Sequence, residues 1–123
     1  MENSSHFEEE KKTIAHFAGI FLKQEFGFPP KSLKVLMDHD LVVIRVDNFL
    51  SPAEIEMGKE KRDTSLIHEM YSNLFNKVKS SLVDRINQIT SKKTISSQIS
   101  INIETKVLLM TFFLALDSIS AGD

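Results

Sequence analysis

The chain has 123 residues, of which 41% are hydrophobic and 26% are charged, which is typical of one globular domain. It contains no cysteine, which excludes disulfide bridges, thiolate nucleophiles and cysteine-ligated metal sites and fits a reducing compartment such as the cytoplasm. The formal net charge of −2 argues against bulk attraction to nucleic acid or anionic lipid.

The sequence does not indicate membrane insertion. Its start is polar and acidic, unlike a signal peptide or a basic transit peptide. The longest apolar run, residues 107–116, is about half the roughly 20 residues that a membrane-spanning helix needs. We therefore expect a cytoplasmic chain that neither inserts directly into a membrane nor binds nucleic acid.

An amphipathic helix is predicted from Phe7 onward, because apolar residues recur there at helical spacing. Gly27 and the pair Pro29–Pro30 should end it. We expect a disordered start at residues 1–6 and a mobile tail at residues 118–123, with a single domain at residues 7–117.

Two alternating strands are predicted next, at Ser32–Met37 and Leu41–Asp47, joined by a turn at residues 38–40. Pairing Met37 with Val42 places the apolar side chains of both strands on one face, which a slip of one residue would destroy. Lys34 then lies directly opposite Arg45 on the other face.

A short helix and a long helix should follow this hairpin. Ser51 and Glu54 match a capping box and Pro52 takes the first helical position, so a short helix is predicted to about Met57. An apolar stripe predicts the long helix over residues 64–90. The stripe consists of Ile67, Met70, Tyr71, Leu74, Val78, Leu82, Ile86 and Ile89.

A second hairpin at residues 95–103 and 106–116 closes the pattern. If Ile101 faces Leu108, the last strand is apolar on both of its faces. The order helix–hairpin–helix–hairpin predicts an α+β fold in two layers, with a four-stranded, mainly antiparallel sheet and the helices on one face. The order of the strands in the sheet stays open.

No catalytic or metal-binding motif is present. The four histidines lack the i, i+4 spacing that brings two imidazoles to one ion, and Asp38-His39-Asp40 fits a turn better than a ligand set. Neither a Gly-x-Ser-x-Gly elbow nor a glycine-rich phosphate loop occurs. We expect no catalytic residue, no metal, no cofactor and no enzymatic activity.

Two binding surfaces are candidates on the outer face of the sheet. An apolar set there indicates self-association, most simply a homodimer, unless a helix covers it. The apolar set is Leu36, Val43, Val107, Leu109 and Phe113. The alternative is an anion or nucleotide-phosphate site built from Lys31, Lys34 and Arg45. Against that site, these side chains can instead extend into water, or Asp47 can neutralise Arg45.

The segment from Phe26 to Glu54 resembles the hallmark of a bacterial domain family, the MpsC-like family, named after a component of a sodium-translocating, membrane-potential-generating system. The matching positions are Gly27, Pro30, Lys31, Ser32, Asp38, Asp40, Arg45, Leu50, Ser51, Pro52, Ala53 and Glu54. The chain departs from the family at residues 27–30, where Gly-Phe-Pro-Pro replaces the usual Gly-Arg-Gly-Pro. It also departs at residues 97–100, where Ser-Gln-Ile-Ser replaces a more polar stretch.

The resemblance implies a small cytoplasmic accessory protein with a membrane-transport protein as a partner, and it implies no reaction. Combined with the apolar outer face, it leads to one hypothesis: a non-catalytic accessory or regulatory binding domain that forms homo-oligomers. An anion or nucleotide-phosphate sensor is the alternative hypothesis.

Overall fold

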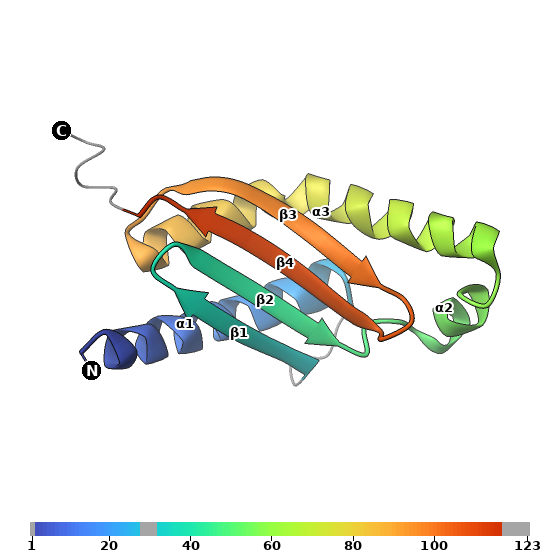
Figure 1. Cartoon of the computed structure of the whole chain (residues 1–123), viewed down its shortest axis with the longest axis horizontal. Coiled ribbons are helices and arrows are strands. Elements are labelled where there is room, and N and C mark those ends of the chain that lie inside the picture. The colour runs from blue at the N-terminus through green and yellow to red at the C-terminus, as the bar shows by residue number, and fades with distance from the viewer. Residues whose placement is uncertain (1, 28–31, 117–123) are drawn as a thin grey trace.

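The computed structural model describes residues 2–27 and 32–116, with side chains from residue 7 onward. Its elements in chain order are α1 (Glu2–Glu25), β1 (Leu33–Asp38), β2 (Leu41–Asp47), α2 (Pro52–Met57), α3 (Lys61–Thr90), β3 (Thr94–Asn102) and β4 (Val107–Leu114). Figure 1 shows the predicted helix–hairpin–helix–hairpin order, which confirms the α+β class. Pro29, Pro30, Lys31 and the tail from residue 118 lie outside the described residues.

All strand pairs are antiparallel, and the four strands lie in the order β1-β2-β4-β3. Both hairpins have the predicted register, with Met37 opposite Val42 and Ile101 opposite Leu108. The sequence left the junction of the two hairpins open. In the structure β2 pairs with β4, so the last strand of each hairpin lies in the centre of the sheet.

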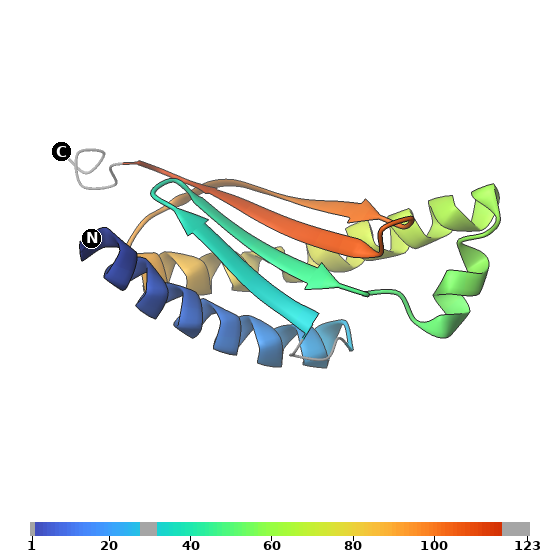
Figure 2. The same cartoon turned by 60° about the horizontal axis from the view of Figure 1, so that its bottom comes forward.

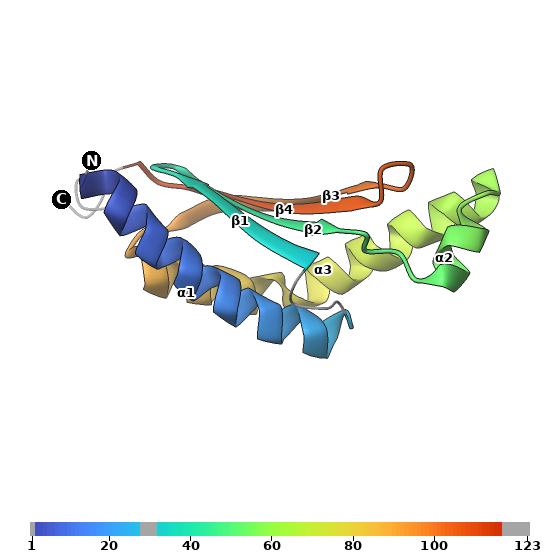
Figure 3. The ribbon, with the colours of Figure 1, turned by 90° about the horizontal axis from the view of Figure 1, so that it is seen from below.

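Both long helices cover the same face of the sheet. Figures 2 and 3 show α1 beneath β1 and α3 beneath β3, and none of the described helices lies on the opposite side of the strands. The core fills the space between the layers. Its fully enclosed side chains include Ile14 and Leu22 of α1, Ile67, Leu82 and Ile86 of α3, and Val42, Ile44, Val46, Leu108, Met110 and Phe112 of the sheet.

The helix boundaries differ from the prediction at two starts. α1 begins at Glu2 instead of Phe7, and α3 begins at Lys61 instead of residue 64. One member of the predicted stripe on α3 was wrong, because Met70 is 42% exposed. Phe75, which the stripe omitted, is buried at 2% exposure since it follows Ile67 and Tyr71 at steps of four residues.

Local capping fixes the start of α2 as predicted. The hydroxyl of Ser51 accepts a hydrogen bond from the Glu54 amide at 3.2 Å, and the Glu54 carboxylate accepts one from the Ser51 amide at 2.9 Å. Pro52 occupies the first turn. This reciprocal pair satisfies two amide groups that the first helical turn would otherwise leave free.

Candidate functional site

The outer face of the sheet, meaning the face turned away from α1 and α3, carries side chains in four rows across the strands. The strand registers give the rows as Asp38–Leu41–Phe113–Ser96, Leu36–Val43–Thr111–Gln98, Lys34–Arg45–Leu109–Ser100 and Asp47–Val107–Asn102. They are called the first to the fourth row below. The junction of β2 with β4 therefore brings the predicted apolar residues of both hairpins into one continuous surface.

The apolar part of this face is open to solvent. Leu36 is 49% exposed and Phe113 is 39% exposed, while Val43, Val107 and Leu109 are half-buried against their neighbours. No helix within the described part of the chain packs over them (Figure 3). Leu41, which the sequence reasoning omitted, joins the patch because it pairs with Phe113.

Charged side chains lie on the β1 side of the outer face, on strands β1 and β2. Lys34 lies opposite Arg45 as predicted. The Nε of Arg45 donates to Oδ1 of Asp47 at 3.0 Å, and both side chains are well exposed, at 44% and 37%. Asp47 thus compensates the Arg45 guanidinium, which weakens the case for an anion site. Lys31 of the predicted trio lies outside the described residues.

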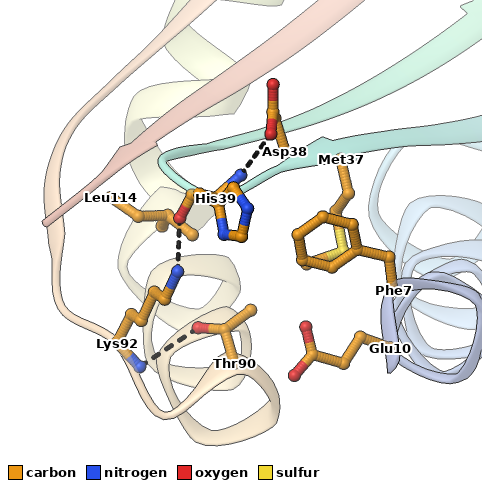
Figure 4. Close-up of a pocket in the computed structure, with 8 residues that line it drawn as sticks. All are labelled: Phe7, Glu10, Met37, Asp38, His39, Thr90, Lys92 and Leu114. Atoms are coloured by element: carbon orange, nitrogen blue, oxygen red, sulfur yellow. Dashed lines mark hydrogen bonds between the residues drawn. The ribbon is translucent and has the colours of Figure 1, made fainter. Parts of the chain in front are cut away.

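A small cavity of about 80 Å³ lies beneath the β1–β2 turn (Figure 4). The His39 amide donates to Oδ1 of Asp38 at 2.7 Å, and the Lys92 ammonium donates to the His39 carbonyl. The His39 ring lies edge-on to Phe7 at 5.2 Å between ring centres. These contacts support the turn interpretation of residues 38–40, and among the described residues no three His, Asp or Glu side chains converge on a metal position.

A second cluster surrounds Tyr71 at the opposite end of the fold. Its hydroxyl donates to both carboxylate oxygens of Glu54 at 3.1 Å, and its ring packs against Phe26 and Phe49, with ring centres 6.1 and 5.1 Å away. Burial, and secondly the Glu54 charge, raise the pKa of Tyr71 well above its ordinary value of 10.0. The cluster ties α1, the β2–α2 loop and α3 together.

The Tyr71–Glu54 contact was missed from sequence. Tyr71 was assigned to an apolar stripe and Glu54 to a helix cap, and both assignments are confirmed. The two residues are 17 positions apart, so no local spacing rule connects them. The available signal was the hydroxyl itself, since a buried tyrosine usually finds a hydrogen-bond partner.

An apolar groove lies between α1 and α3. It has a volume of about 380 Å³ and is lined mainly by α1, with Ile20 half exposed. The Arg85 guanidinium lies 5.5 Å from the centre of the Phe17 ring, a distance at which a cation is attracted to the ring face. This contact couples the two helices on their solvent side.

The architecture defines the class of the protein: a two-layer α+β domain in which all the described helices that pack on the sheet cover the same face. Within the described residues no helix combines the length and the apolar character needed to cross a membrane. The chain belongs to the MpsC family, described as a Na+-translocating membrane potential-generating system, whose model matches residues 8–116. No curated protein and no solved structure matches it.

Proposed function

We propose that this chain is a non-catalytic accessory or regulatory domain of a membrane-potential-generating system, and that it acts as a homodimer in the cytoplasm. The observation that carries the proposal is the uncovered apolar patch on the outer face, which extends over β1, β2 and β4. A contiguous exposed patch of this kind on a small domain commonly marks an interface.

A second copy of the chain is the occupant that fits the outer face. The patch carries acidic and basic residues beside its apolar centre, so one copy offers both signs of charge to another. Four strands about 4.8 Å apart and four rows about 6.6 Å apart give a face of ~500 Å² per copy. Two such faces in full overlap would bury about 1,000 Å², the small end of specific interfaces.

The accessory role is supported by the family and by the lack of a membrane-spanning helix among the described residues. The family description names an ion-translocating system, and translocation of Na+ needs a pathway through the bilayer. The chain would therefore act on a membrane-transport partner, and not as the pathway itself.

Dimer formation is tested by sedimentation equilibrium from about 5 to 500 µM, the range in which small interfaces dissociate. Leu36→Asp places a charge in the patch and should weaken the dimer at least about tenfold. Leu66→Asp is a matched control, because Leu66 is 51% exposed on α3 against 49% for Leu36. A monomeric wild-type chain over the whole range would disprove the homodimer.

The accessory role is tested separately, by measuring membrane potential with a voltage-sensitive dye in cells that lack the chain. Potential in sodium-containing medium should fall, return with wild-type protein or Leu66→Asp, and stay low with Leu36→Asp. An unchanged potential in the absence of the chain would refute the accessory role.

The anion-sensor alternative predicts a different result. Phosphate or nucleotide bound near Lys34 and Arg45 would raise the melting temperature by mass action. Lys34→Ala and Arg45→Ala would remove that rise. If neither ligand shifts the melting temperature of the wild-type chain, the alternative is rejected.

A further inference from the structure

We infer that two copies pack outer face against outer face about a two-fold axis that crosses the strands along the second row, Leu36–Val43–Thr111–Gln98. This inference rests on the homodimer proposed above and specifies its geometry. Such an axis reverses the direction of each strand in the second copy and keeps the strand order, so every strand lies over its own counterpart. The first row then meets the third row of the other copy and the second row meets itself, while the fourth row lies beyond the first row of the other copy.

The outward residues of strand β1 support this axis. Its outward residues are Lys34, Leu36 and Asp38, which read basic, apolar and acidic at equal spacing. An axis at Leu36 places Lys34 of each copy against Asp38 of the other. Opposite charges then meet at two symmetric contacts, while Leu36 packs on Leu36.

The second row itself is suited to lie on the axis. A residue on a two-fold axis meets its own copy, so a charged residue there would be repelled. The first, third and fourth rows all contain charged residues, namely Asp38 in the first, Lys34 and Arg45 in the third, and Asp47 in the fourth. The second row contains none.

The polar members of the second row can also pair with themselves. The Thr111 hydroxyl and the Gln98 amide each contain both a donor and an acceptor. Each can therefore form a hydrogen bond with the same group of the second copy. Val43 and Leu36 supply self-matching apolar contacts at the other end of the row.

The first and third rows match each other under the same axis. Phe113 of one copy lies over Leu109 of the other, so the Phe113 ring, the one aromatic side chain of the patch, is covered. Leu41 lies over the alkyl part of Arg45, whose charge Asp47 already compensates within its own chain. Antiparallel stacking of this kind agrees with the small crossing angle of aligned sheet packing, about −30°.

A charge-exchange experiment tests the geometry. Lys34→Asp alone places acid against acid at both charge contacts, and Asp38→Lys alone places base against base. Each variant should dimerise about tenfold or more weakly than wild type. Mixed in equal amounts they place acid against base at both contacts, and a heterodimer of near wild-type affinity should form. Lys77→Asp, the same charge change on exposed α3, should leave dimerisation unchanged.

Cross-linking gives a second test that does not depend on charge. Because the chain lacks cysteine, one introduced thiol is unique. Thr111→Cys should cross-link to itself through a reagent that spans about 10 Å, the separation of stacked sheets. Ser96→Cys should cross-link to Ser100→Cys in a mixture and not to itself, and Ser81→Cys on α3 should not react within the dimer.

The outcomes separate the two proposals. A wild-type dimer in which the mixed variants fail to associate, or in which Thr111→Cys fails to cross-link, overturns the axis and leaves the homodimer standing. A chain that is monomeric throughout overturns both. Restored association together with the predicted cross-links supports both.

Discussion

The chain contains one tyrosine and no tryptophan, so the ionisation of Tyr71 is directly visible. Its pKa is raised above 10.0, first by burial of the hydroxyl and then by the charge of Glu54. We predict that the folded protein keeps the Tyr71 proton at pH values where free tyrosine has lost it. The perturbation is therefore a simple increase in pH beyond about 10.

The effect on stability follows from proton linkage. Below pH 10 the tyrosine is protonated in both the folded and the unfolded chain, and its contribution to stability is complete. Above pH 10 the unfolded chain releases the proton and the folded chain keeps it, so the free energy of unfolding falls as pH rises. The loss from this group approaches about 1.4 kcal/mol for each pH unit until the folded-state pKa is reached.

Two measurements check this behaviour. Tyrosinate absorbance should appear together with the loss of helical circular dichroism in an alkaline titration, since ionisation requires unfolding. Urea unfolding at a series of pH values gives the slope of stability against pH. Tyr71→Phe, measured in parallel, removes the tyrosine contribution, and the difference between the two chains isolates it from every other titrating group.

Tyr71→Phe also has a cost at neutral pH. It removes a hydroxyl that donates to the Glu54 carboxylate, and a hydrogen bond to a charged group contributes about 1.5–3 kcal/mol. The ring keeps its contacts with Phe26 and Phe49. Reversible titration of Tyr71 near pH 10 with unchanged circular dichroism would contradict the raised pKa. The same pH slope for Tyr71→Phe as for wild type would also contradict it.

Three further predictions concern stability and are checked by urea unfolding. Phe112→Ala should cost about 3–5 kcal/mol because Phe112 is fully enclosed and packs against Phe75. Phe113 lies on the other face of β4 at 39% exposure, so Phe113→Ala should cost less than about 1.5 kcal/mol in the monomer. Equal costs would contradict the assignment of the two side chains to opposite faces. Ser51→Ala removes half of the capping box and should cost about 1 kcal/mol, and a change below a few tenths would show that the cap is dispensable. Gly27→Ala should cost about 1–2 kcal/mol because φ is +79°, although an added methyl group meets no atom of the described residues within 4 Å. Gly27→Asn should cost less, and the reverse order would contradict a left-handed backbone.

The features predicted from sequence share a local physical cause. The register of each hairpin follows from a period of two and a short turn, so Met37–Val42 and Ile101–Leu108 could be paired without knowledge of the fold. The cap at Ser51 depends on groups three residues apart. In each hairpin, a register shifted by one residue would bury polar side chains and expose apolar ones within the same few residues.

The features that were missed depend on contacts between distant segments. The β2–β4 junction joins two hairpins, each already consistent by itself, so hairpin patterns leave several strand orders open. The Tyr71–Glu54 hydrogen bond depends on how α2 docks on α3. Met70 was misassigned because an apolar side chain at the margin of a helical stripe can face either side, and only the packing of the layers decides which.

The strand order also indicates how a partner approaches the sheet. The two strands with more than one outward apolar residue, β2 and β4, lie in the centre. Edge strand β1 carries one, Leu36, and the outward residues of edge strand β3 that pair with β4 are serine, glutamine and asparagine. A register irregularity between Thr94 and Ser96 interrupts that edge, and such bulges discourage pairing with another strand. Apolar surface thus increases toward the middle of the face while one edge is protected. This distribution favours a partner that lies over the face, as a second copy would, instead of one that adds a strand at β3.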